Sequence, residues 1–90
     1  MQKNINVILS LVNMSEKKQH YKPIRNLTEI NTLFKNKPIV FNIANKKYAL
    51  IYNPANYEIQ VKAQSPTPAL IATFNQTSTL EQILHTFGKL

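Results

Sequence analysis

The sequence has no cysteine, no aspartate, no tryptophan and a single glycine. Without cysteine the chain has no disulfide bond, no thiolate metal ligand and no thiol nucleophile. This composition fits a reducing compartment, so we expect a cytoplasmic protein. One glycine, Gly88, cannot build the glycine-rich loops that cradle phosphate groups in nucleotide-binding enzymes.

Acidic residues are the second shortage. The only acids are Glu16, Glu29, Glu58 and Glu81, against 11 Lys and Arg residues, and the formal net charge is +7. The glutamates belong to separate predicted elements, so no two carboxylates are spaced for acid–base catalysis. The excess of positive charge instead indicates an anionic partner.

Histidine is scarce as well, with only His20 and His85 in the chain. His85 lies four residues after Glu81 on a predicted helix, a spacing typical of a surface pair. Two such groups do not make a metal site, and no Ser-His-acid set can be named. We therefore expect a protein that is not an enzyme and that binds neither metal nor cofactor.

No hydrophobic run is long enough to span a membrane, so we expect no membrane partner. A chain of 90 residues with 43% hydrophobic residues suits one small domain with one core. Within the single domain 1–90, residues 26–90 are predicted to form a compact α-β-β-β-β-α core. Residues 1–25 are predicted to form an N-terminal arm that is flexible or partly ordered.

The central part of the sequence, Lys37–Phe74, predicts four short strands. Apolar residues alternate with others, as strand side chains do when one face of a sheet is buried. The predicted turns are Asn45-Lys46, residues 53–56 and residues 65–68, and each has an even number of residues. An even number keeps the apolar residues of all four strands on one face.

This arrangement predicts a definite register for each hairpin. The predicted pairs are Ile43–Tyr48, Phe41–Leu50 and Ile39–Tyr52; then Tyr52–Tyr57, Leu50–Ile59 and Tyr48–Val61; then Ala63–Leu70, Val61–Ala72 and Ile59–Phe74. The opposite face is mostly polar, which is typical of an antiparallel sheet with one packed and one exposed face.

Two amphipathic helices flank the predicted strands. Asn26 with Glu29 predicts the start of the first helix, and Ser78 with Glu81 predicts a capping box for the second. Gly88 stands where a glycine often follows a helix end. The predicted buried stripes are Leu27, Ile30, Leu33 and Phe34 in the first helix and Leu80, Ile83, Leu84 and Phe87 in the second. We expect both helices to cover the apolar face of the sheet, in an α+β fold with a four-stranded antiparallel meander.

Residues 1–13 fit more than one structure. Alternation of Ile5, Val7, Leu9 and Leu11 predicts a strand that adds to a sheet edge, and β-branched side chains favour it. The set Ile5, Ile8, Leu9 and Val12 fits one face of a helix instead. A third interpretation places the natural start of the protein at Met14.

The order of helix, four strands and helix is similar to that of the double-stranded RNA-binding domain, which has a helix, three strands and a second helix. That family's second helix begins with basic residues, whereas the corresponding residues here, Gln76-Thr77-Ser78-Thr79-Leu80, include none. This chain also has one strand more. Shared element order alone implies no function.

Two binding functions remain, and the favoured one is nucleic-acid binding through the polar sheet face and the basic arm. Lys47 and Lys62 are predicted to lie directly opposite each other, and Tyr21 is predicted to be available for stacking. The predicted nucleic-acid-binding residues are Lys17, Lys18, Tyr21, Lys22, Arg25, Asn42, Lys46, Lys47, Gln60 and Lys62.

The alternative is a protein interaction module or small regulator, acting on another protein or on a second copy of itself. Its surface would be a sheet edge or a small apolar patch on the exposed face. The predicted patch residues are Val40, Ala49, Ile51 and Ile71.

Overall fold

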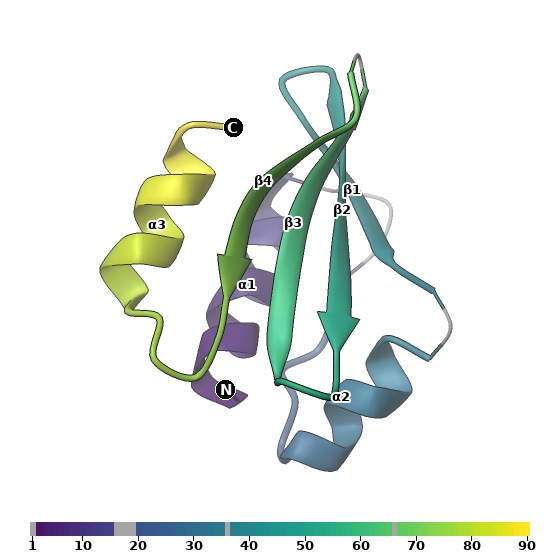
Figure 1. The fold of residues 1–90 in the computed structure, drawn as a ribbon, viewed down its shortest axis with the longest axis vertical. Coiled ribbons are helices and arrows are strands. Elements are labelled where there is room, and N and C mark those ends of the chain that lie inside the picture. The colour runs from purple at the N-terminus through teal and green to yellow at the C-terminus, as the bar shows by residue number, and fades with distance from the viewer. Residues whose placement is uncertain (1, 16–19, 36, 66) are drawn as a thin grey trace.

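A computed structural model of the protein describes residues 2–15, 20–35, 37–65 and 67–90 (Figure 1). These described residues form three helices and four strands. Their bounds are α1 (Gln2–Ser15), α2 (Leu27–Leu33), β1 (Ile39–Ile43), β2 (Lys46–Asn53), β3 (Glu58–Ser65), β4 (Ala69–Phe74) and α3 (Leu80–Gly88).

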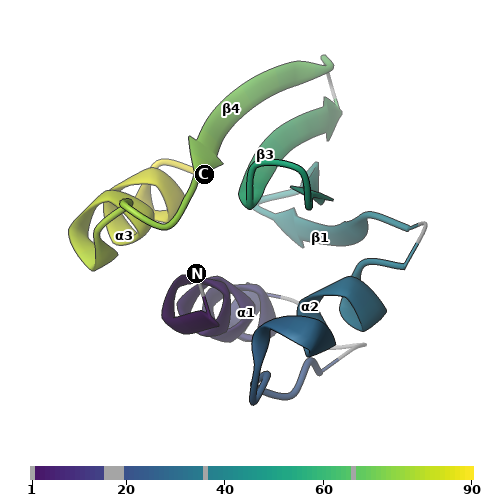
Figure 2. The same cartoon turned by 60° about the horizontal axis from the view of Figure 1, so that its bottom comes forward.

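The four strands form one antiparallel sheet in the order β1-β2-β3-β4, which confirms the predicted α+β meander. All three helices lie on the same side of the twisted sheet, and its other face is left uncovered (Figure 2). The sheet and helices share one hydrophobic core. Its fully buried large side chains are Ile5, Ile8, Leu9, Val12, Ile30, Phe41, Leu50, Ile59, Val61 and Ile83.

The register of the first hairpin differs from the predicted register by two residues. The turn is formed by Ala44 and Asn45, both at positive φ (52° and 66°), instead of Asn45-Lys46. This turn pairs Phe41 with Tyr48, whose rings stack with centroids 5.5 Å apart. The stacked pair is buried in the core, and this burial explains why an alanine accepts a left-handed conformation.

The second hairpin is displaced by two residues in the same way, because its loop is residues 54–57. Tyr52 pairs with Ile59 and Leu50 with Val61. Asn53 accepts a hydrogen bond from the Ala55 N–H through its side chain (3.0 Å), a contact that stabilises the turn. A displacement of two leaves the side chains that remain in the strands on their predicted faces, although both registers were wrong. Tyr57 is the exception, because it was predicted to pair with Tyr52 and lies instead in the loop, 45% exposed.

The third hairpin follows the predicted register only in part. Ile59 pairs with Phe74 and Val61 with Ala72, as predicted. A bulge between Val61 and Lys62 then shifts the register, so that Leu70 lies opposite Lys62 instead of Ala63. Leu70 is therefore on the uncovered face, where 57% of its surface is exposed.

Residues 2–15 form a helix, so the preferred strand interpretation of residues 1–13 was wrong. The buried residues of α1 are Ile5, Ile8, Leu9 and Val12, the set that fits one helical face. Burying four apolar side chains against the sheet outweighs the weak β-propensity of the segment.

The segment after α1 is held along that helix by two asparagines. The Asn6 side chain accepts from the Ile24 N–H (2.7 Å) and donates to the Ile24 carbonyl (3.1 Å). Asn13, two helical turns later, makes the same pair of contacts with Tyr21 (2.8 and 2.7 Å). Ile24 is buried, so the described part of the predicted arm belongs to the packed structure.

The helix caps differ in detail from the prediction. Asn26 caps α2, but Glu29 accepts from the Arg25 N–H instead of completing a capping box with Asn26. In α3 the capping box is Thr79 with Gln82, one residue later than predicted. Gly88 is the last residue of the helix, and Lys89 is the C-cap.

The buried stripe of α3 is narrower than predicted. Ile83 and Phe87 are buried, and the Phe87 ring stacks on Phe41 with centroids 5.9 Å apart. Leu80 and Leu84 are about half exposed because they lie beyond the edge of the core.

Candidate nucleic-acid interface

The connector between α1 and α2 keeps only part of its predicted basic surface. Lys17 and Lys18 lie outside the described residues. Lys22 and Arg25 are exposed. Tyr21 is half-buried and packs against the core, so its ring is not the free stacking surface that the sequence suggested.

The predicted lysine pair on the sheet does not form. Lys62 lies opposite Ala49, and Lys47 lies opposite Asn42 and Ser65. The two-residue displacement of the second hairpin is the cause, because it moves Lys62 along β2. Lys46 lies on the other face of the sheet, two residues from buried Tyr48. Asn42, Lys47, Gln60 and Lys62 therefore share one face of the sheet, but Lys47 and Lys62 do not lie directly opposite each other.

The predicted apolar patch on that face is also altered. Ala49 is completely buried beneath its neighbours and cannot contact a partner. Val40 and Ile51 are half-buried, and Ile71 is 41% exposed. Leu70, which the sequence placed in the core, lies beside Ile71 at the bulge and adds to the patch.

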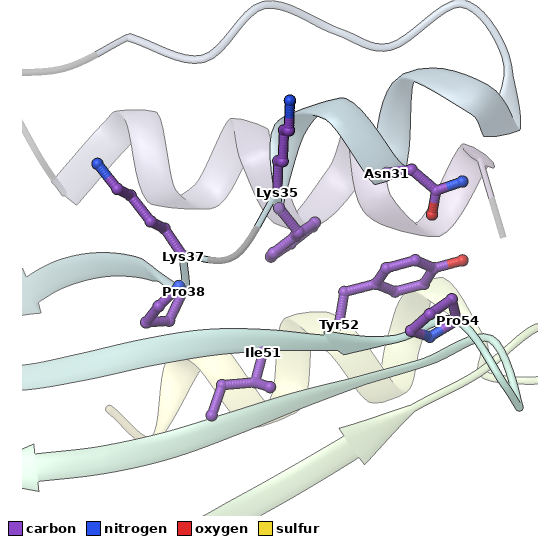
Figure 3. Close-up of a pocket in the computed structure, with 8 residues that line it drawn as sticks. Asn31, Lys35, Lys37, Pro38, Ile51, Tyr52 and Pro54 are labelled. Carbon is purple, nitrogen blue, oxygen red and sulfur yellow. The ribbon is translucent and has the colours of Figure 1, made fainter.

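A groove that the sequence did not predict lies between α2 and β2 (Figure 3). We call it the α2–β2 groove, and its volume is about 510 Å³. It is lined by Asn31, Phe34, Lys35, Lys37, Pro38, Ile51, Tyr52 and Pro54.

The groove exists because β2 is longer than its neighbour β1. The pairing of the two strands ends at Ile39 with Leu50, so Ile51 and Tyr52 have cross-strand partners only in β3. The chain that precedes β1 comes from α2, which ends at Leu33 with Phe34 as its C-cap. Pro38 then leads into β1, and the space beside the end of β2 stays open.

Two aromatic rings form the centre of the groove. Tyr52 lies against Phe34 with ring centroids 5.6 Å apart and an angle of 34° between the ring planes. Phe34 is buried and Tyr52 is half-buried, so Tyr52 presents the accessible ring. Burial, with a smaller contribution from nearby Tyr57, raises the pKa of the Tyr52 hydroxyl, which therefore stays protonated at neutral pH.

The groove is also positively charged. Lys35 and Lys37 are exposed at its rim, and no glutamate lines it. Throughout residues 2–15, 20–35, 37–65 and 67–90, no lysine or arginine forms an ion pair with a glutamate. The sequence pattern did not single out these two lysines, although Lys35 and Lys37 both lie in the short segment between Phe34 and Pro38.

The rest of the described molecule offers little other chemistry. His85 is exposed and lies in a shallow polar groove between β4 and α3, with Thr73, Gln82 and Thr86. No three His, Cys, Asp or Glu side chains of the described residues are grouped as metal ligands. No helix in that part of the chain has the length and hydrophobicity to cross a membrane.

Comparison of the chain with protein-family models, curated proteins and solved structures found no match.

Proposed function

We propose that this protein is a non-enzymatic domain that binds nucleic acid through the basic residues around α2. The observation that carries the proposal is the set of cations that precede and follow this helix in the sequence, none of which forms an ion pair with a glutamate that the structure describes. We call this set the basic band; its members are Lys22, Arg25, Lys35 and Lys37.

The one acid within this stretch, Glu29, offsets one of the four positive charges and leaves the band with a net positive charge. Its carboxylate accepts a hydrogen bond from the Arg25 backbone N–H (3.0 Å), and not from a cationic side chain of the band. Unpaired cations lose little on binding a phosphate, because no existing ion pair has to be broken. Each phosphate contact also releases condensed counterions, which favours association at low salt.

Fluorescence anisotropy with labelled oligonucleotides at low salt tests the proposal. Four engaged cations give a slope of log affinity against log salt of about −3 on single strands. The double variant Lys35→Gln/Lys37→Gln should reduce the magnitude of this slope by about 1.4. The control Lys3→Gln/Lys89→Gln removes the same charge from exposed residues outside the band and should change the slope much less.

Absence of binding to every oligonucleotide at low salt would reject the proposal. So would an affinity that does not respond to salt.

The second candidate is a protein interaction through the uncovered sheet face, supported by the exposed pair Leu70 and Ile71. Large apolar side chains grouped on a surface favour contact with another protein surface. Sedimentation of the protein over a range of concentrations tests the version in which a second copy binds. Ile71→Lys should then abolish a dimer, while salt-dependent oligonucleotide binding should be unaffected.

A further inference from the structure

We propose that the α2–β2 groove receives one unstacked base of a single-stranded nucleic acid, while Lys35 and Lys37 contact the adjoining phosphates. This inference rests on the proposed function and narrows it, because it names the form of nucleic acid and the site of its base.

The shape of the groove suits a flat aromatic group. Its volume of about 510 Å³ lies within the range of about 300–1,000 Å³ that is usual for small-molecule sites. The surface is mainly apolar: Pro54 lies beside the accessible Tyr52 ring, and Pro38 and Ile51 complete the apolar lining (Figure 3). Bases stack on aromatic side chains with little dependence on their identity.

Polar and charged groups are arranged around this apolar surface. Asn31 is exposed on the α2 side of the groove, and its side chain makes no hydrogen bond to any described residue. Its amide can both donate to and accept from the edge of a base. Lys35 and Lys37 extend away from β2, outside the apolar lining, where the backbone of a bound nucleotide would lie (Figure 3).

A double helix does not fit this site. Bases of a duplex are stacked and paired, so entry of one base requires that it first be unstacked. Single strands and unpaired loops present such bases without that cost. The positive rim also distinguishes this ligand from an uncharged aromatic molecule, for which the two lysines would supply no attraction.

The test compares three labelled probes of equal length: oligothymidylate, a strand of abasic sites with the same phosphates, and a duplex. Wild-type protein should bind oligothymidylate about tenfold more tightly than the abasic strand, the effect expected for one stacked base. A strand with one 2-aminopurine should also change its fluorescence on binding, which requires no variant.

Two variants locate the effect in the groove. Tyr52→Leu keeps an apolar side chain against Phe34, so the fold should survive, as circular dichroism can verify. It should lower the affinity for oligothymidylate to that for the abasic strand and leave the abasic affinity unchanged. Lys35→Gln/Lys37→Gln should weaken binding of both oligothymidylate and the abasic strand, whereas Lys3→Gln/Lys89→Gln should preserve the tenfold preference for oligothymidylate.

The outcomes separate this inference from the proposed function. Equal binding of oligothymidylate and abasic strand overturns the inference but leaves salt-dependent nucleic-acid binding in place. Retention of the preference in Tyr52→Leu also overturns it. Failure of all three probes overturns both the inference and the proposed function.

Discussion

At the residue scale, Tyr52 contributes to both the core and the surface. Its ring packs on Phe34, and the half-buried side chain also lines the α2–β2 groove. Burial raises the pKa of its hydroxyl, with Tyr57 adding to the effect. A tyrosine in this setting is therefore less easily ionised in the folded protein than in the unfolded chain.

This shift makes folding sensitive to alkaline pH. Because the folded pKa exceeds the unfolded value of 10.0, the folded state binds more protons above that value. The stabilising contribution is then full below pH 10.0 and is lost as pH rises through the folded pKa. Thermal midpoints measured across this range should fall less steeply in Tyr52→Phe than in wild type. Tyr57→Phe keeps the burial of Tyr52, so most of the dependence should remain; identical pH profiles for Tyr52→Phe and wild type would contradict the assignment.

At the scale of elements, α1 organises the segments that pack against it through asparagine side chains. Asn4 donates to the carbonyls of Asn75 and Ser78 (2.9 and 3.0 Å), so the loop before α3 is held to α1. Asn6 and Asn13 hold the connector that leads to α2. These three asparagines weaken the amphipathic pattern of α1, but they position the connector to α2 and the loop before α3.

Asn6→Ala tests this role for the connector. The variant removes both hydrogen bonds between the Asn6 side chain and the partly buried backbone N–H and carbonyl of Ile24. This loss should lower the free energy of unfolding by about 1–3 kcal/mol. Denaturant unfolding should give this loss, and hydrogen exchange should show faster exchange at the Ile24 amide. Ser10→Ala, at an exposed position of the same helix, should stay within about 0.5 kcal/mol of wild type. Equal effects of the two substitutions would show that the connector does not depend on Asn6.

At the scale of the whole molecule, the stability of a sheet that is covered on one face depends on every element that covers it. The three helices share that face, and α1 contributes four of the core's fully or almost fully buried side chains, Ile5, Ile8, Leu9 and Val12. A small domain has few alternatives when such a part of its core is lost. The N-terminal helix is therefore part of the folding unit and not an appendage to it.

A chain that begins at Met14 should accordingly fail to fold stably. Removal of residues 1–13 exposes the apolar residues of the sheet that α1 covers, so an apolar dye should bind and the thermal transition should be lost or move to much lower temperature. A truncated chain with an unchanged thermal midpoint would contradict the role of α1. Addition of the missing segment as a separate peptide is a useful control, because it should restore part of the transition.

The sequence by itself determined the number of strands, their order and the face that most strand side chains occupy. Side chains of a strand alternate between the two faces of a sheet with a period of two residues. A displacement of two residues, as in the first and second hairpins, therefore leaves these properties unchanged. Tertiary structure decided the registers, the bulge that exposes Leu70, and the choice of helix for α1. These depend on packing between distant residues, such as Phe41 with Phe87, which no local pattern contains. Tertiary structure also decided the α2–β2 groove, because the groove arises where β2 extends past β1 and α2 closes the opposite side.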